Sequence, residues 1–262
     1  MHKLKISIVT PSFNSARFIE DCIKSVVNQG YPDYEHVIID GGSTDKTLEI
    51  LRRYPQLKWI SEPDQGQSDA LNKGFKMATG DIIGWLNSDD VYLPNTFDKV
   101  AKYLSETEYD AVYSNLFFSD ENLKVTRELR THEPVRWLSL FHCFIPSATF
   151  FFRRRIIDGG IKMDEGKHIT MDKEFFANIL FNGYRIGYVD DFFSVFRWHA
   201  KNKSLDSREV TRVRTKEGIE LVNKYWNTNI PNNRLTQALY FVFDDYILKI
   251  YRAYLKYQTK AN

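Results

Sequence analysis

From Leu4 to about Phe118, short β-rich runs alternate with amphipathic segments, and this alternation restricts the fold more than any other feature of the chain. Successive strand and helix units of this kind build a mostly parallel sheet that is covered by helices. The strands are expected at residues 5–10, 34–40, 57–61, 81–86 and 110–116. The sequence therefore predicts an α/β fold.

The first helix has the clearest signal, because apolar residues between Phe18 and Val27 recur at the spacing of one helix face. Further helices are expected near Ser43 and Ser68, whose hydroxyls can cap free amides. Another is expected near Pro94, because proline suits a first helical turn.

After residue 120 the alternation gives way to irregular strands, a helix at 172–181 and a strand-like run at 184–198. Two more helices are expected from residue 207 onward, separated by a turn at 227–233. We expect one domain over 1–204, with a nucleotide-binding half at 1–118 and an acceptor-side half at 119–204, and a helical C-terminal extension over 205–262.

Lysine and arginine total 36 against 34 aspartate and glutamate residues, a net charge of +2. This balance gives no overall field to hold a nucleic-acid backbone, so no nucleic-acid partner is expected. Cys22 and Cys143 are too few and too far apart for a disulfide framework, which fits a reducing compartment. No secretory leader is expected, because the first residues lack a charged segment followed by an apolar one, and the longest uncharged run, 137–152, is shorter than a membrane-spanning helix needs. We expect a cytoplasmic protein.

Small polar and acidic residues cluster directly after three of the expected strands. They form the segments TPSFN at 10–14, DGGSTD at 40–45 and NSDD at 87–90. Ligands of open α/β sheets bind at this edge, and clustered carboxylates repel one another unless a cation or a donor-rich ligand is bound. The pattern indicates a divalent metal or a hydroxyl-rich ligand. The alternative is that Ser43, Asp45 and Asp89 are only helix caps and turn residues.

These loops belong to a longer series of motifs, TPSFN, DGGSTD, NKGFKMATGDIIGWLNSDD, SATFFFRR, MDKEF and RWHAKNKS, between Lys5 and Ser204. In order and spacing the series resembles glycosyltransferase family 2, the inverting enzymes of the GT-A fold. The resemblance implies a Rossmann-like GT-A domain with a mostly parallel central sheet and flanking helices. It also implies sugar transfer in bacterial glycan synthesis, with a UDP-sugar as the favoured donor and a glycan or polyprenyl-linked acceptor.

The resemblance assigns the donor site to the polar loops. In the family, the first loop and the aspartate that opens the second contact the nucleobase and ribose, and the D-x-D motif binds the metal. The matched nucleotide-binding residues are Thr10, Pro11, Ser12, Phe13, Asp40, Asn87 and Ser88. Asp89 is the matched metal ligand, and its hard oxygens suit Mn²⁺ or Mg²⁺, which would neutralise the leaving diphosphate.

Two positions depart from the family pattern. Asn87 replaces the first aspartate of D-x-D with a neutral amide, which leaves Asp90 as the residue that can compensate. Leu71 stands where many members carry an arginine, next to the asparagine matched by Asn72. Contacts from that helix to the nucleotide are therefore expected from Gln67, Asp69 or Lys73.

Inversion needs a base that takes the proton of the acceptor hydroxyl while its oxygen attacks opposite the leaving diphosphate. The family places an aspartate for this role in the motif matched by MDKEF, which makes Asp172 the expected base. Helical spacing puts Asp172, Phe176 and Ile179 on one face, directed toward the fold. The alternative is that Asp172 only caps the helix. The donor and acceptor pocket is expected to include Asp90, Glu174 and Trp198.

His199 aligns with a histidine that in related enzymes reaches the metal or the diphosphate, and neutral imidazole is a plausible ligand. A packed or hydrogen-bonded histidine is the alternative. Lys201 and Lys203 follow it, either as a charged lid over the diphosphate or as solvated loop lysines.

The C-terminal segment is expected to be a basic amphipathic helix. Its apolar residues are Leu239, Phe243, Ile247, Ile250 and Tyr254, and its basic residues are Lys249, Arg252, Lys256 and Lys260. Such a helix can lie on an anionic membrane, which predicts peripheral attachment at the inner face of the cytoplasmic membrane. The alternatives are that the apolar face packs on the catalytic domain or forms a homodimer.

Two other functions compete with sugar transfer. A sugar nucleotidyltransferase also uses an α/β sheet and a nucleotide, but its glycine-rich, basic loop after the first strand is replaced here by residues 11–14. A catalytically impaired sugar-nucleotide-binding protein is the second alternative, because Asn87 and Leu71 depart from the family pattern. No G-x-G-x-x-G motif follows a strand, so a dinucleotide-dependent dehydrogenase is not expected.

Overall fold

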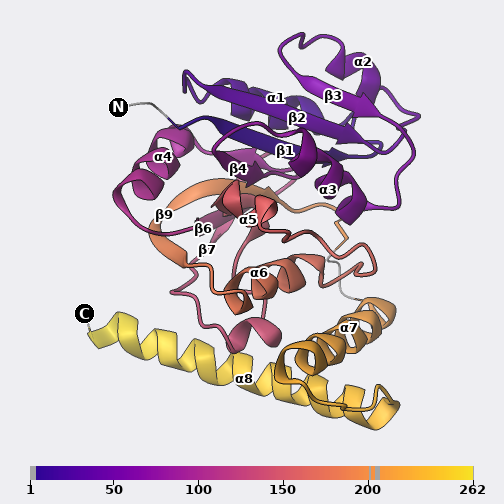
Figure 1. Cartoon of the computed structure of the whole chain (residues 1–262), viewed down its shortest axis with the longest axis vertical. Helices are drawn as coiled ribbons and strands as arrows, with labels where there is room; N and C mark the ends of the chain where they lie inside the picture. Colours follow the sequence, from indigo (N-terminus) through magenta and orange to yellow (C-terminus); the bar gives the residue numbers. More distant parts are fainter. Residues whose placement is uncertain (1–3, 201, 204–206, 262) are drawn as a thin grey trace.

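A nine-stranded sheet forms the centre of the computed structural model, which describes residues 4–200, 202–203 and 207–261 (Figure 1). The strands are β1 (Ile6–Ser12), β2 (Tyr34–Asp40), β3 (Lys58–Ser61), β4 (Ile82–Trp85), β5 (Val91–Tyr92), β6 (Ala111–Ser119), β7 (Val125–Leu129), β8 (Phe151–Arg153) and β9 (Ile186–Arg197). Their order in the sheet is β3-β2-β1-β4-β8-β6-β9-β5, and β7 also pairs with β6.

The α/β class predicted from the sequence is confirmed. β1 to β4 pair in parallel, as expected, and β6 is parallel to β9. The other half of the sheet is mixed, because β8 runs antiparallel to β4 and β6, β7 to β6, and β5 to β9. β7 carries no sequence signal, since its side chains are almost all exposed and no apolar alternation marks it.

Helices cover both faces of the sheet and form the C-terminal extension. They are α1 (Ile19–Val27), α2 (Thr47–Leu51), α3 (Gln67–Met77), α4 (Thr96–Glu106), α5 (Arg155–Asp158), α6 (Met171–Phe181), α7 (Arg208–Trp226) and α8 (Arg234–Ala261), with short 3₁₀ helices η1 (Leu138–Leu140) and η2 (Ser147–Thr149). In Figure 1, α6 lies between the sheet and the α7–α8 pair. The expected domain boundary at residue 204 falls outside the described residues.

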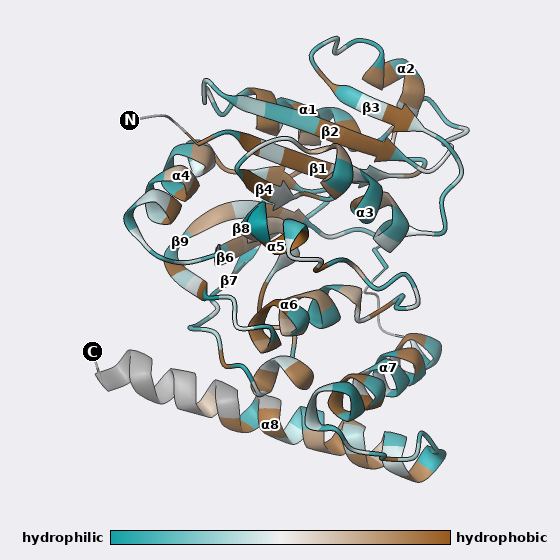
Figure 2. Cartoon of the chain, in the orientation of Figure 1, coloured by the Kyte–Doolittle hydropathy of each residue, from teal (hydrophilic) through white to brown (hydrophobic). Residues whose placement is uncertain are grey.

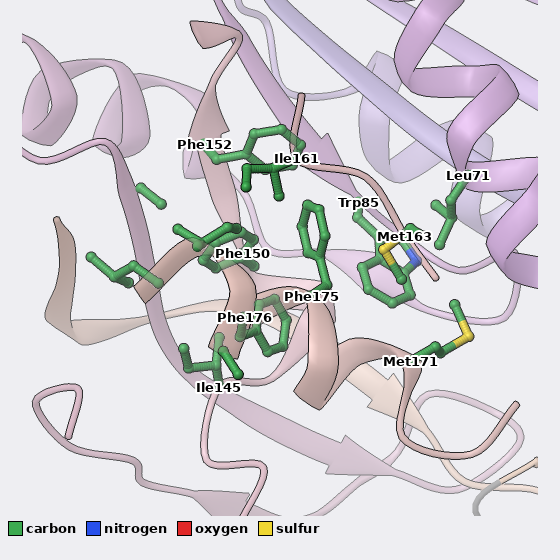
Figure 3. Packing of buried hydrophobic residues seen from close by; sticks show 14 of the residues in the cluster. Leu71, Trp85, Ile145, Phe150, Phe152, Ile161, Met163, Met171, Phe175 and Phe176 are labelled. Atoms are coloured by element: carbon green, nitrogen blue, oxygen red, sulfur yellow. The ribbon is translucent and has the colours of Figure 1, made fainter. Parts of the chain in front are cut away.

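Apolar side chains fill both faces of the sheet, and the central strands are largely hydrophobic (Figure 2). One cluster joins α3 and α6 to the sheet, and a second joins α1 and α4 to it. Leu71 is fully buried in the first cluster with Trp85 and Phe175, and Figure 3 shows it among these core side chains. The position of the family arginine is therefore a packing position in this chain.

Two expected helix caps are wrong. α2 begins at Thr47, whose amide donates to the Asp45 side chain at 2.9 Å, and α3 begins at Gln67 without a side-chain bond from its N-cap residue. The hydroxyl of Ser43 donates to Asp40 instead, and Ser68 lies inside the first turn of α3. The Ser68 hydroxyl donates to the carbonyl of Lys167 and to Sδ of Met171, so neither serine caps the helix expected near it.

The extension is the expected pair of helices, but the apolar residues of α8 divide between two faces. Tyr240 and Ile247 are buried, whereas Leu239 and Ile250 are 60% and 54% exposed. The inward face packs on the domain, since the Tyr240 hydroxyl donates to the carbonyl of Leu140 in η1 at 2.9 Å. None of the helices described is long and apolar enough to cross a membrane. The side chains of four residues of the predicted helix lie outside the described ones, namely Arg252, Tyr254, Lys256 and Lys260.

Candidate active site

Three polar loops meet at the carboxyl edge of β1, β2 and β4, as the sequence predicts. The amide of Gly41 donates to the carbonyl of Ser12 at 2.8 Å, and the Asn14 side chain accepts from the amide of Thr44 at 2.9 Å. The hydroxyls of Ser15 and Ser88 are 2.8 Å apart. These bonds join the loops after β1, β2 and β4 into one surface.

Asp40 lies beneath this surface rather than on it. Its carboxylate is fully buried and accepts hydrogen bonds from the amide of Ser43 at 2.8 Å and the hydroxyl of Ser61 at 2.7 Å. The amide of Gly42 donates to the same carboxylate at 3.1 Å. Asp40 therefore holds the loop after β2 in its conformation. Its carboxylate has little hydrogen-bond acceptor capacity left for a nucleoside.

Thr10 and Pro11 are likewise buried, and the Thr10 hydroxyl lies 2.9 Å from the ring of His36. Burial lowers the pKa of His36 to about 3, so this pair is neutral. Ser12 and Phe13 differ from these two. The buried Ser12 hydroxyl has no hydrogen-bond partner within the described ranges, and the Phe13 ring is 62% exposed. The end of β1 thus offers a ligand a hydroxyl and an aromatic face.

The side-chain amide of Asn87 bonds to residues of α3, of β4 and of its own loop. Its oxygen accepts from the side chains of Gln67 and Trp85, each at 2.9 Å, and its nitrogen donates to Asp90 at 3.2 Å. Only a group that both accepts and donates makes this set of contacts, whereas an aspartate would place a second carboxylate against Asp90. The hydrogen bonds at position 87 therefore explain why an asparagine, and not an aspartate, stands there.

Asp90 does not face the surface that a donor would contact. It is fully buried, and the amide of Arg197 donates to it at 3.0 Å. Burial and the neighbouring Asp89 charge raise the pKa of Asp90. The expectation that Asp90 lines the pocket finds no support in its position, because the carboxylate is held under the loop.

Asp89, in the loop after β4, faces His199, in the loop after β9. The Asp89 carboxylate lies 2.9 Å from Nε2 of His199, and the side chain of Asn202 lies 3.5 Å from the same oxygen. The imidazole also packs on Phe18, with ring centroids 4.8 Å apart. Within the described part of the chain, no group of three or more His, Cys, Asp or Glu side chains is placed to hold a metal ion. A carboxylate and an imidazole alone would leave most coordination positions to a ligand.

Asp172 is the second residue of α6, and it is not the N-cap that the alternative requires. Its carboxylate accepts from the amide of Lys173 at 2.7 Å and from the thiol of Cys143 at 3.5 Å. The residue before the helix is Thr170, and its side chain makes no capping bond within α6. Burial raises the pKa of Asp172. A partly desolvated carboxylate of this kind is a stronger base than an ordinary aspartate.

The loop after β9 contacts Asp89 and the residue that precedes Asp172. His199 and Asn202 contact Asp89, and Nζ of Lys203 lies 3.9 Å from Sδ of Met171, the residue before Asp172. Burial lowers the pKa of Lys203, and the charges of Asp172 and Glu217 raise it. Asp89 and Asp172 are thus joined through one short segment. Lys201, the other predicted lid residue, lies outside the described residues.

Several predicted residues are occupied elsewhere. Lys73 forms ion pairs with Glu62 at 2.8 Å and with Asp69 at 3.2 Å, so both expected charges on α3 already have partners. Glu174 is buried against α7, where it pairs with Lys224 at 2.6 Å. The pocket role expected for Glu174 is not supported by this placement.

Trp198 remains 43% exposed and packs edge-on against Phe118, with ring centroids 6.2 Å apart.

Sequence reasoning missed two residues that contact the site. Cys143 carried no motif at all, and Glu217 lies in a charged helix where nothing distinguishes it from solvated glutamates. Only the folded chain places both beside the start of α6.

The fold and the motifs have counterparts among known proteins. The family model Glycosyl transferase family 2 matches residues 7–180. An uncharacterized glycosyltransferase of Nostoc sp. is 27% identical over 86% of this chain and 75% of its own length. A PGL/p-HBAD biosynthesis glycosyltransferase of Mycobacterium bovis is 35% identical, but over 45% of this chain and 49% of the relative.

Two solved structures share the fold. Residues 1–349 of TarS of S. aureus, in complex with UDP-GlcNAc, have a TM-score of 0.66 and 20% identity over 87% of this chain and 68% of that 1–349 chain. A mannosyltransferase from Pyrobaculum calidifontis, in complex with GDP-Man and Mn²⁺, has a TM-score of 0.66 and 19% identity over 100% of this chain and 77% of its own. The expected GT-A-like fold is confirmed by these matches.

Proposed function

The chain belongs to glycosyltransferase family 2, and on that premise we propose that it transfers one sugar from a nucleoside-diphosphate sugar to a glycan or lipid-linked acceptor, with inversion, in bacterial glycan synthesis. One observation carries this proposal. The loop after β9 contacts Asp89 through His199 and Asn202, and approaches Asp172 through Lys203. These contacts support the proposal that a metal-ligating carboxylate and a basic carboxylate belong to one site. Residues 1–118 supply the donor half, and 119–204 the acceptor half.

The donor is proposed to bind at the end of β1, with a UDP-sugar as the first candidate. The exposed ring of Phe13 provides a stacking face for a base, and the unpartnered hydroxyl of Ser12 provides a hydrogen bond. Ser88 and Gln67 border the same surface through Ser15 and Asn87. Support also comes from the structural neighbours, which hold UDP-GlcNAc and GDP-Man.

Asp89 and His199 are proposed to hold a divalent ion, Mn²⁺ or Mg²⁺. The two side chains suit these ions as ligands, because a carboxylate oxygen and an imidazole nitrogen lie 2.9 Å apart and both bind Mn²⁺ or Mg²⁺. With only two protein ligands, affinity would come largely from the diphosphate of the nucleotide. When bound, the ion neutralises the charge that grows on the leaving diphosphate. The Mn²⁺ in the mannosyltransferase neighbour supports this assignment.

Asp172 is proposed to accept the proton of the acceptor hydroxyl. Burial raises the pKa of the group, which makes it a better base for an alcohol held in line with the leaving diphosphate. The Lys173 amide, at 2.7 Å, holds one carboxylate oxygen in position. The Asn87 contacts speak against the impaired-protein alternative, because they account for the unusual residue without loss of the Asp89 site.

A donor panel tests the proposed function. UDP-, GDP- and dTDP-sugars are each added with Mn²⁺, and thermal unfolding and transfer to water or an acceptor are measured. We expect one nucleotide class to stabilise the protein by about 2.7 kcal/mol at 100 times its dissociation constant when the metal is present, and by less at the same concentration without the metal. Stabilisation by a nucleoside triphosphate plus a sugar phosphate, but by no nucleotide sugar, would instead indicate a nucleotidyltransferase.

The exposed side of α8 is proposed to attach the enzyme to an anionic membrane, near a lipid-linked acceptor. Its apolar residues recur at spacings of 4, 3, 4 and 4, and all are more than half exposed; they are Leu235, Leu239, Val242, Tyr246 and Ile250. The exposed Lys249 lies on the same helix. An apolar stripe with adjacent lysine suits the interface of an anionic bilayer.

Val242→Glu should lower binding to anionic vesicles at least about tenfold, because it places a charge within the stripe that the membrane would bury. Phe241→Glu is the matched control, since this exposed neighbour points away from the stripe by about 100° of helix rotation. Vesicle co-sedimentation of both variants is the measurement. Equal binding by the two variants contradicts the membrane assignment, and a concentration-dependent dimer that only Val242→Glu disrupts would assign the stripe to a second copy of the chain.

A further inference from the structure

The segment that leads into α6 is held by a residue of another helix. Of the first amides of α6, which have no backbone partner within the helix, that of Lys173 donates to the Asp172 carboxylate of the same helix. Glu217 of α7 binds the residues that precede the helix. Its carboxylate accepts from the amides of His168 at 2.9 Å, Ile169 at 3.2 Å and Thr170 at 2.8 Å, and from the Thr170 hydroxyl at 2.9 Å. Four donors of one short segment therefore converge on one carboxylate.

Glu217 is ionised where it lies. The residue is 5% exposed, yet the hydrogen bonds from the His168 and Thr170 segment outweigh burial and lower the pKa of Glu217. Bonds to a charged acceptor are stronger than neutral ones, and a negative charge is favoured at a helix N-terminus. The contact thus fixes the segment from which the first turn of α6 begins.

The base candidate Asp172 sits two residues beyond Thr170, within this first turn. Its carboxylate faces Cys143 from the η1–η2 loop, Lys173 on its own helix and Lys203 from the loop after β9. Lys203 responds to the charges of both Asp172 and Glu217. Any shift of the first turn would therefore move the carboxylate relative to the donor side of the site.

The extension holds α6 at further points. Lys224 of α7 pairs with Glu174 at 2.6 Å, and the hydroxyl of Tyr240 in α8 lies 3.2 Å from Nζ of Lys173. These contacts keep the body of the helix in place if one bond at its start is lost. They make it possible to change Glu217 without detaching α6 from the extension (Figure 1).

We propose that Glu217 is a positioning residue for sugar transfer: from the C-terminal extension, it sets the first turn of α6 and so aims the carboxylate of Asp172 at the acceptor hydroxyl. The inference rests on the proposed function, because it takes Asp172 as the base. It assigns the extension a part in the active site in addition to any role in attachment.

Glu217→Gln tests this inference, since it keeps the volume but places an amide nitrogen against the backbone donors. We expect kcat to fall about 10- to 100-fold, because small misplacements of a reacting group have effects of this size. The KM for the donor should stay within about threefold. The acid limb of kcat should move to lower pH, because amides released from Glu217 would favour the charged form of Asp172.

Glu220→Gln is the matched control. It removes a carboxylate three residues further along α7, one that pairs with Lys167 of the same segment, and should leave kcat within about twofold. Glu217→Asp should recover part of the lost rate, because it restores a charged acceptor. Unchanged kcat in Glu217→Gln would overturn the inference. A second result would also overturn the inference. If Glu217→Gln and Glu217→Asp both lose kcat and donor binding in parallel, and the acid limb of kcat does not shift, the residue has only a structural role.

The two proposals fail in different ways. If the wild-type protein transfers no sugar from any donor, the proposed function is wrong and the inference falls with it. If the wild type is active and Asp172→Asn is not, while Glu217→Gln behaves like the wild type, only the role of Glu217 is contradicted.

Discussion

Asp172→Asn is expected to bind the donor with near wild-type affinity and to transfer sugar at least about 10²-fold more slowly. The amide keeps the shape of the side chain and can still accept from the Lys173 amide. It cannot take a proton from the acceptor hydroxyl. The loss should therefore fall on kcat, with the donor KM within about threefold of the wild-type value. Donor affinity by calorimetry and initial rates of transfer measure the two effects separately.

The pH dependence of kcat provides a second test of the role of Asp172. Transfer needs Asp172 ionised, so the rate should fall as the pH drops through its pKa, which burial has raised above that of an ordinary aspartate. The acid limb of kcat should accordingly lie at higher pH than a solvated aspartate would give, and Asp172→Asn should abolish it. Asp158→Asn, on the exposed end of α5, is the control and should leave the profile unchanged. Near-normal turnover of the Asp172 variant would remove this residue from the base role.

Asp89→Asn is expected to remove metal-dependent donor binding and to lower transfer about 10²-fold or more. The substitution deletes the only carboxylate that faces His199 within the described part of the site. It should also lower the pKa of Asp90, because the Asp89 charge contributes to raising it. Weak, metal-independent binding of the nucleotide should survive, since the Phe13 and Ser12 end of the site is untouched.

Titration of each variant with Mn²⁺ and nucleotide by calorimetry checks this prediction. Asp191→Asn is a matched control, because Asp191 is a partly exposed carboxylate that pairs with Lys99 on the far side of β9. A variant at position 89 that still binds Mn²⁺ and donor like the wild type would show that the metal, if one is used, binds elsewhere.

The sequence predicted the first half of the fold well because that half follows local rules. β2 spans Tyr34–Asp40, the expected residues, since the β-branched run at 37–39 ends there in a polar loop. α1 was predicted from its apolar spacing for the same reason. β7 was not predictable, because its side chains are almost all exposed, and the two-residue β5 is too short to show a period.

Motifs predicted which loops meet, but they did not predict which side chains reach the surface. Asp40 and Asp90 match the family motifs, yet the fold buries both and uses their oxygens within loops. Phe13 and Asp89, from the same motifs, remain accessible. The difference arises from long-range contacts, such as the Arg197 amide on Asp90, which link segments about a hundred residues apart. Such contacts leave no trace in local composition.

Glu217 shows the same limit more sharply. Within α7 it is one of three glutamates, and only the packing of α7 against α6 places it on the His168 and Thr170 amides. α8 was predicted as one apolar face, whereas the folded helix packs Tyr240 inward and leaves Leu239 outward. Helical periodicity identifies amphipathic residues, but it does not show which of two adjacent stripes the domain covers.

The central claim is that the metal at Asp89 and the base at Asp172 share one site, and paramagnetic relaxation tests it most directly. Cys143, whose thiol lies 3.5 Å from Asp172, can carry a ¹⁹F label attached at alkaline pH, while Cys22 is fully buried. Addition of Mn²⁺ and UDP should broaden the label's signal strongly, whereas Mg²⁺ and UDP, or Mn²⁺ and UDP with Asp89→Asn, should not. A signal that stays sharp when Mn²⁺ and nucleotide are shown to be bound would contradict the account.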